Sequence, residues 1–144
     1  MIKKNLIFFI SDFSYGGAGN SISKLCLKLP VNQFEISIIC IGKSPYSNIL
    51  RKRGINVYEL KKKKLIFSIF ELNKLIKNIF KKNLKNILIS NIHYNNIILL
   101  LLSKKIGGFK VILVERTPLE ELDIFFSISD FLKKKTIKFL VNLV

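Results

Sequence analysis

A glycine-rich segment near the amino terminus is the first place where this sequence could do chemistry. Residues 16–19 read Gly-Gly-Ala-Gly and lie between an apolar run and an amphipathic stretch. Backbone N–H groups and the positive end of the helix dipole at such a helix start can bind a phosphate group. Glycine permits close approach of a ligand and the positive φ angles of a tight turn. The segment is therefore either a phosphate-binding loop or a tight strand-to-helix turn.

His93 is the only histidine of the chain, and it lies in the segment Ser-Asn-Ile-His-Tyr-Asn-Asn at residues 90–96. This segment follows an apolar run of strand character. An imidazole at the end of a strand could hydrogen-bond a reacting group as charge develops on it. The alternative is an ordinary surface histidine or a core histidine with satisfied hydrogen bonds.

Arg116 is one of three arginines in a chain that has 22 lysines. Its planar guanidinium can bind a carboxylate or a phosphate through two parallel hydrogen bonds, which a lysine cannot do. Arg116 is therefore a candidate binding residue. A salt bridge to Glu115, Glu120 or Glu121 is the alternative.

Several familiar chemistries lack their motifs. A Walker loop requires Lys followed by Ser or Thr, whereas Asn20 and Ser21 follow the last glycine. The dinucleotide fingerprint has Ile22 where its third glycine should stand, and no acid ends the strand expected at residues 34–41. No Gly-x-Ser-x-Gly elbow is present. Nicotinamide cofactors and serine hydrolase chemistry are therefore not expected.

The two cysteines, Cys26 and Cys40, fall on the apolar faces of their expected elements. We interpret them as reduced core residues of a cytosolic protein rather than as a disulfide or a metal site. A single histidine excludes a catalytic zinc site built from histidines. Neither a metal nor any other cofactor is expected.

The elements that must position these residues alternate along the chain. Apolar runs predict parallel strands, and apolar residues at helical spacing predict amphipathic helices between them. Strands are expected at residues 6–10, 34–41, 55–60, 86–90 and 109–114. Helices are expected from the glycine segment to Pro30, at residues 45–53, from Ser68 to about residue 80, at residues 95–106, and from about Asp130 onward. This order predicts an α/β fold with a Rossmann-like, mostly parallel sheet covered by helices on both faces.

Local signals mark some of the helix ends. Gly54 stands where a left-handed residue would end the helix at residues 45–53, and Gly107 follows the helix at 95–106 in the same way. Ser68 and Glu71 have the spacing of a capping box, with Phe67 and Leu72 at the hydrophobic-staple positions. The sequence therefore predicts a helix that begins at Ser68.

Three segments in register resemble the amino-terminal domain of family 4 glycosyltransferases, which are retaining enzymes of the GT-B fold. They are the Gly-Gly-Ala-Gly turn followed by Ser-x-x-Lys-Leu, the segment at residues 90–96, and Val-Glu-Arg-Thr-Pro-Leu at residues 114–119. The resemblance covers essentially the whole chain. It implies the amino-terminal half of a two-domain enzyme that transfers a sugar from a nucleotide-sugar donor to a glycan, lipid-linked or envelope acceptor.

The resemblance also implies roles for individual residues. Gly16 and Gly17 would approach the donor diphosphate through their backbone, and His93 would lie near the reacting sugar as the catalytic residue. Asn91 and Arg116 would line the cleft on the acceptor side. Members of this family are typically independent of metal ions.

The family's donor motif, Glu-x7-Glu, belongs to a second domain that this sequence lacks, and no strand follows the expected last helix. Residues 1–144 are therefore expected to form one domain, truncated before its last strand and without activity alone.

The formal net charge of +16 favours anionic partners, although a lysine-rich and isoleucine-rich composition weakens that inference. The alternative function is a non-catalytic peripheral membrane module, because the expected last helix has an apolar face and a lysine-rich remainder that suit an anionic surface. That face could equally pack on the sheet. The expected location is the cytoplasm, either free or at the inner face of a membrane. Nucleic-acid binding is not expected, because no recognition motif accompanies the basic runs.

Overall fold

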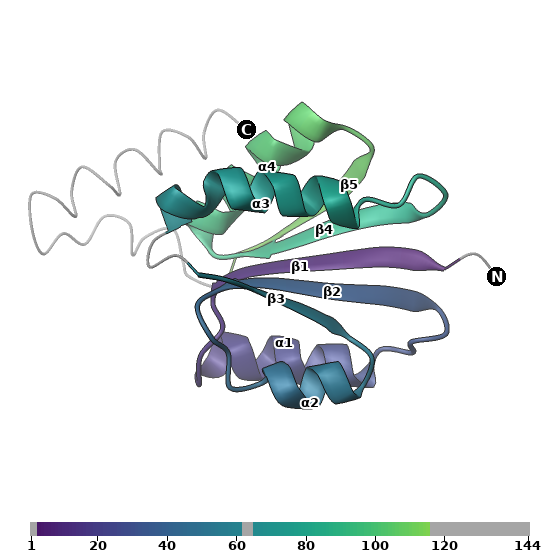
Figure 1. Cartoon of the computed structure of the whole chain (residues 1–144), viewed down its shortest axis with the longest axis vertical. Coiled ribbons are helices and arrows are strands. Elements are labelled where there is room, and N and C mark those ends of the chain that lie inside the picture. Colours follow the sequence, from purple (N-terminus) through teal and green to yellow (C-terminus); the bar gives the residue numbers. More distant parts are fainter. Residues whose placement is uncertain (1–2, 62–64, 116–144) are drawn as a thin grey trace, which may run out of the picture.

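The computed structural model describes residues 3–61 and 65–115 and shows a five-stranded, all-parallel sheet between two layers of helices (Figure 1). The strands are β1 (Lys4–Asp12), β2 (Phe34–Ile41), β3 (Asn56–Leu60), β4 (Lys85–Asn91) and β5 (Phe109–Val114). The helices are α1 (Gly17–Lys28), α2 (Ser47–Lys52), α3 (Leu65–Ile79) and α4 (His93–Ile106). The strand order is β3-β2-β1-β4-β5. The predicted fold class, α/β with a Rossmann-like parallel sheet, is confirmed.

The apolar run of β1 explains why this strand lies at the centre of the sheet. Successive side chains of a strand point to opposite faces, so a strand covered on both sides must be apolar at every position. Leu6, Phe8 and Ile10 belong to the core beneath one helix layer. Ile7 and Phe9 belong to the core on the other side.

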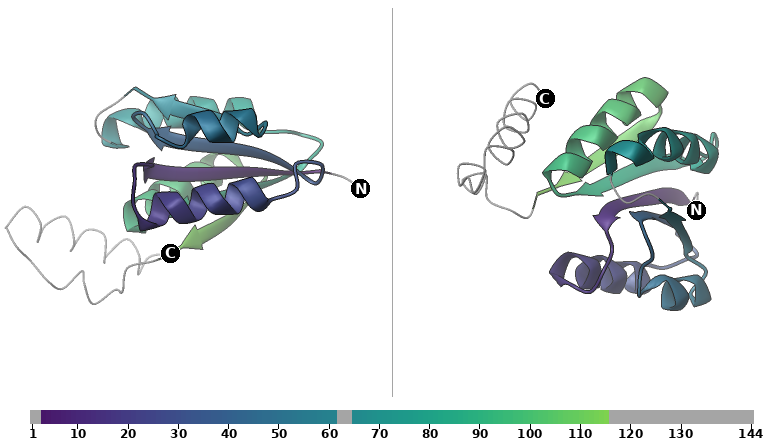
Figure 2. Two further views of the ribbon diagram at one scale, coloured as in Figure 1. Left: turned by 90° about the horizontal axis from the view of Figure 1, so that it is seen from below. Right: turned by 60° about the vertical axis from the view of Figure 1, so that its left-hand side comes forward.

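The two helix layers cover these two cores. Figure 1 shows α1 and α2 on one face of the sheet and α3 and α4 on the other, and Figure 2 shows the same layers from two further directions. Ile22 and Cys26 of α1 and Leu50 of α2 pack on the first core. The second core contains residues of α3 and α4, namely Leu72, Ile76, Ile79, Leu99 and Leu102. The helical spacing of the apolar residues therefore identified most of the buried positions, but Leu25, which was expected on the buried face of α1, is 49% exposed.

The predicted start of α3 is wrong. The helix begins no later than Leu65, so Ser68 lies inside it, where it is fully buried, and Phe67 is 66% exposed rather than packed as a staple. The reason is the helical period, because Ser68, Leu72 and Ile76 are spaced by four residues and share the face that meets the sheet. A small serine fits this face, so its capping-box spacing to Glu71 is coincidental.

Two glycines end helices as predicted. Gly54 follows α2 with φ of 82°, and Gly107 follows α4 with φ of 75°. Both angles lie in the region that favours glycine.

Both cysteines are free and buried, as predicted. Burial raises the pKa of the Cys26 thiol and that of the Cys40 thiol to about 12. Within residues 3–61 and 65–115, no group of three potential metal ligands is present. No helix in the same part of the chain is long and apolar enough to cross a membrane. The expected helix from Asp130 onward lies outside the described residues.

Candidate functional site

The strand order creates a switch point between β1 and β4. From β1 the chain proceeds outward to β2 and β3, and it then returns to place β4 on the other side of β1. In open parallel sheets, ligands bind beyond the carboxyl ends of the strands at the point where the direction of winding reverses. Phe9 of β1 is paired in register with Ser90 of β4. The segments that follow these two strands are therefore neighbours, and they carry the glycine segment and residues 91–93.

The glycine segment leaves open space in front of α1. Gly16 is extended, with φ of 170° and ψ of 173°, and Gly17 is the first residue of the helix. A Cβ atom added to either glycine would meet no heavy atom within 4 Å. No side chain caps the helix. The start of α1 is therefore not covered by protein atoms at the Cβ positions of these two glycines. The expectation of positive φ in this turn is wrong, since Gly16 is extended and Gly17 is helical.

Gly19 has a different role from its two neighbours. A Cβ atom at this position would overlap the Ser14 carbonyl oxygen and would stand 3.2 Å from the Tyr46 ring. This glycine therefore lets the turn after β1 pack closely on the first turn of α1.

Three aromatic side chains stand beside the glycine segment, and the sequence analysis missed them. The Tyr46 ring lies 5.1 Å from Phe13 and 5.7 Å from Tyr15, measured between ring centroids. Phe13 is buried, whereas Tyr15 is 82% exposed. Tyr15 thus presents an aromatic ring at the edge of the candidate site. The position of Tyr15 directly before the glycines could have marked it as a candidate site residue. Its contact with Tyr46 could not be predicted, because the two residues are 31 positions apart in the sequence.

Buried amides hold the segment between β4 and α4. The Ser90 hydroxyl donates a hydrogen bond to Asn96 Oδ1, and Asn96 Nδ2 donates to the Val114 carbonyl and to Glu115 Oε2, each at 3.3 Å. Asn95 Nδ2 donates to the Asn91 carbonyl at 2.7 Å. These bonds join the end of β4, the start of α4 and the end of β5. These bonds restrict the geometry of the segment, although Asn95 Oδ1 is buried without a hydrogen-bond partner in the described part of the chain.

Ile92 carries backbone strain between Asn91 and His93. Its φ is 78° and its ψ is 145°, and it is the one non-glycine residue with positive φ in the described part of the chain. A β-branched residue rarely adopts this conformation, which costs about 1–3 kcal/mol. Such strain is often found at functional sites because it aims the neighbouring residue. Here that neighbour is His93.

This strain predicts an unusual order of stability. We expect Ile92→Gly to have a free energy of unfolding about 1–2 kcal/mol higher than Ile92→Ala, because only glycine adopts the conformation without strain. Urea denaturation of both variants measures the difference. Tyr46 precedes α2 with φ of −86°, so the matched pair Tyr46→Gly and Tyr46→Ala should differ by less. Equal differences at the two sites would contradict the assignment of strain to Ile92.

The structure brings together three of the five predicted site residues. Gly16, Gly17 and Asn91 lie on the two segments that flank the switch point. Asn91 is only 2% exposed, so it lies beneath the surface of this region. The backbone of His93 begins α4, while its side chain lies outside the described structure. Arg116 also lies outside the described residues. The chemical roles of all five remain predictions.

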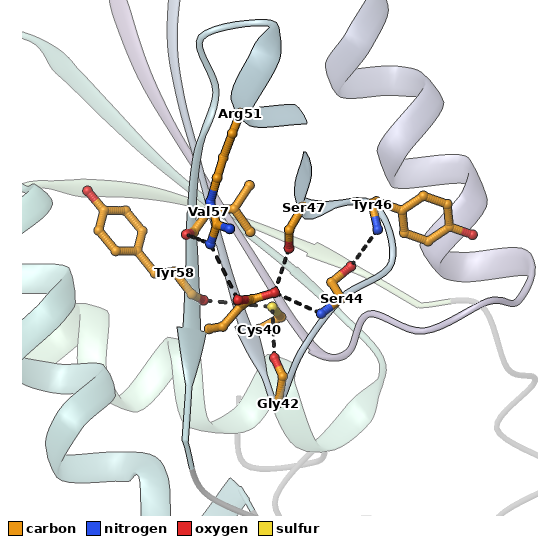
Figure 3. A network of polar contacts seen from close by, with 9 residues as sticks. Cys40, Gly42, Ser44, Tyr46, Ser47, Arg51, Val57 and Tyr58 are labelled. Carbon is orange, nitrogen blue, oxygen red and sulfur yellow. Dashed lines mark hydrogen bonds and ion pairs between the residues drawn. The ribbon is translucent and has the colours of Figure 1, made fainter. Parts of the chain in front are cut away.

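A polar network at Glu59 holds the loop that carries Tyr46 (Figure 3). Glu59 Oε1 accepts hydrogen bonds from the Ser44 N–H at 2.8 Å and from the Ser47 hydroxyl at 2.6 Å. Arg51 lies 3.4 Å from Glu59 Oε2 and donates to the Val57 carbonyl at 2.9 Å. Burial raises the pKa of Glu59, but the hydrogen bonds from Ser44, Ser47 and Arg51 outweigh it and hold the pKa below its usual value. All these acceptors and donors have protein partners, so the network is structural.

The lowered pKa of Glu59 predicts a pH-dependent contribution to stability. A carboxyl whose pKa is lower in the folded state stabilises the fold at pH above its unfolded pKa. That contribution is lost as the pH falls below the ordinary value of 4.5 and through the lower pKa of the folded state. We expect Glu59→Gln to lower the free energy of unfolding by about 1–2 kcal/mol at pH 7. The difference from the parent chain should shrink in denaturation curves measured toward pH 3, and a constant difference would contradict this explanation.

The chain matches no model of a known protein family. No curated protein matches it either.

Proposed function

We propose that this chain is the acceptor-side, amino-terminal domain of a retaining glycosyltransferase of the GT-B type. One observation carries the proposal. The glycine segment follows β1, and residues 91–93 end β4 and begin α4, so both lie at the carboxyl ends of the two strands that flank the switch point, where such folds bind ligands. The substrate class is a nucleotide-sugar donor with a glycan or lipid-linked acceptor.

The open space at Gly16 and Gly17 supports the role of this segment in donor binding. A diphosphate can approach backbone N–H groups at the start of a helix only where no side chain blocks it. Both glycines have that space, and no acidic residue lies in the first turn of α1. The positive end of the helix dipole is therefore available to an anion.

In the proposed reaction, residues of this domain orient the sugar rather than bind a metal. His93 hydrogen-bonds the donor sugar or the acceptor hydroxyl as charge develops in the transition state. Arg116 contacts the acceptor, and Asn91, which is buried, supports the acceptor side from the end of β4. The strained backbone at Ile92 sets the direction in which His93 leaves the end of β4.

Gly17→Val tests the proposal in a complete enzyme in which a donor domain follows this chain. The added side chain meets no protein atom near its Cβ, so the fold should tolerate it. We expect the KM for the nucleotide sugar to rise at least tenfold, because the branched side chain blocks the approach of the diphosphate. Leu25→Val, two turns further along α1 at an exposed position, is the control and should leave KM unchanged. An unchanged KM in Gly17→Val would refute donor binding at this segment.

The 144-residue chain by itself provides a second test. We expect it to bind nucleotide sugars weakly and to transfer nothing, because the donor pocket belongs to the second domain. Calorimetric titration and a transfer assay with a labelled donor measure both. Measurable transfer by the pure chain would contradict the assignment of the donor pocket to a second domain. An in-frame Glu-x7-Glu domain downstream of codon 144 would support that assignment.

A further inference from the structure

A lysine groove lies at the amino-terminal edge of the sheet, opposite the candidate site. It is lined by Lys3, Lys4, Lys82, Asn83, Leu84 and Lys85, and its volume is about 480 Å³. The lining combines the start of β1 with the turn between α3 and β4. Four lysines and no acidic residue are among these lining residues of the described chain.

The sheet register places two of these lysines side by side. Lys4 of β1 is the direct partner of Lys85 of β4. Paired residues of adjacent strands point to the same face, and like charges in such a pair are destabilising. The high lysine content of the chain explains exposed lysines in general. It does not explain two in register at the mouth of a groove that already holds two more.

The nearest described ion pair does not neutralise the groove. Glu35 of β2 lies 3.2 Å from Lys81, the residue just before the lining segment, and so compensates that lysine. The Lys4 ammonium lies 6.0 Å above the Phe34 ring, which is a weak contact for a charged group. An anion bound in the groove would compensate the positive charges of its lysines.

Buried amides fix the turn that carries half of the groove. Asn86 Oδ1 accepts from the Lys81 N–H at 3.0 Å, while Asn86 Nδ2 donates to the carbonyls of Lys81 and Leu84 at 2.8 and 3.0 Å. Asn5 Nδ2 donates to Asn86 Oδ1 at 2.8 Å and so connects the turn to β1. The backbones that carry the lysines are thus held in place before any ligand binds, which reduces the ordering cost of binding.

We propose that the lysine groove binds a phosphate-bearing ligand, with Lys4 and Lys85 in register as its central contacts. Lysine ammonium groups bind phosphate oxygens as point charges. Several ammonium groups around one groove favour a multiply charged group, a diphosphate or a cluster of phosphates, over a single carboxylate. This site is at the opposite edge of the sheet from Gly16 and Gly17, so it does not depend on the proposed function.

Thermal unfolding with pyrophosphate tests the proposal on the 144-residue chain. We expect pyrophosphate to raise Tm by several degrees at low ionic strength, and Lys4→Gln/Lys85→Gln to remove that rise. The control, Lys24→Gln/Lys104→Gln, makes the same change of charge at two exposed positions of α1 and α4 and should keep the rise. Lys4→Arg/Lys85→Arg should also keep it. Equal loss of the rise in both glutamine variants would mean a nonspecific charge effect and would overturn the site.

A vesicle assay identifies the source of the phosphate. The chain is sedimented with vesicles of equal parts phosphatidylglycerol and phosphatidylcholine. If Lys4→Gln/Lys85→Gln loses vesicle binding and the control keeps it, the phosphate belongs to a lipid headgroup. If the rise in Tm with pyrophosphate depends on Lys4 and Lys85 but vesicle binding does not, the ligand is a free phosphate compound. If neither probe depends on the pair, the proposal is wrong.

Discussion

Gly19→Ala is expected to lower the free energy of unfolding by about 2–3 kcal/mol, which for a chain of this size lowers Tm by roughly 6–12 °C. The new Cβ atom would overlap the Ser14 carbonyl oxygen, which is backbone and cannot rotate away. The gain in helix propensity from glycine to alanine, about 1 kcal/mol, offsets only part of this cost. Calorimetry or urea denaturation measures the loss.

Gly17→Ala is the matched control, because it makes the same substitution two residues earlier in the same helix. Its Cβ atom meets no heavy atom within 4 Å, so the variant should be as stable as the parent chain or more stable by about 0.5 kcal/mol. If both variants had equal stability, the close packing of the turn on α1 would not be a feature of the protein in solution.

His93→Ala is expected to lower kcat by roughly 10²–10³ in a complete enzyme, because one hydrogen bond to developing charge is worth a few kcal/mol. The prediction depends on the proposed function. His93 begins α4 directly after the strained residue Ile92, at the carboxyl end of a strand beside the switch point. Steady-state kinetics and thermal unfolding are measured on the same preparation, and Tm should change much less than kcat.

Leu101→Ala is a suitable control for that experiment. Leu101 lies on the same helix and is exposed, so its removal should affect neither kcat nor Tm strongly. If His93→Ala kept full turnover but lost several degrees of Tm, His93 would be a structural residue and its catalytic role would be refuted.

The sheet was predictable because its strands are buried on both faces. Such strands must be apolar at nearly every position, and this pattern is visible in β1 and β2 without any knowledge of their partners. The edge strand β5 is apolar too, although Ile112 and Leu113 are each 40% exposed in the described structure. The alternation of strands with amphipathic helices then implied parallel neighbours.

The start of α3 was less predictable, because a capping pattern is short and occurs by chance. Ser68 and Glu71 have the spacing of a capping box, but α3 begins earlier in the sequence. Packing against the sheet buries Ser68 inside the helix, on the same face as Leu72. Similarly, the sequence left the glycine segment as either a phosphate-binding loop or a tight turn, and the structure adds that Gly19 is required for the close packing of this turn on α1.

The sequence by itself determined the fold class, the two buried faces of the sheet and the segments that end at its carboxyl edge, because these depend on local periodicity. Only the tertiary structure decided which segments meet. The pairing of β1 with β4, the contact of Tyr15 with Tyr46, the strain at Ile92 and the register of Lys4 with Lys85 depend on strand order and on packing between residues far apart in the chain. No local pattern encodes these contacts, because the free energy that selects them is gained only when the whole sheet is assembled.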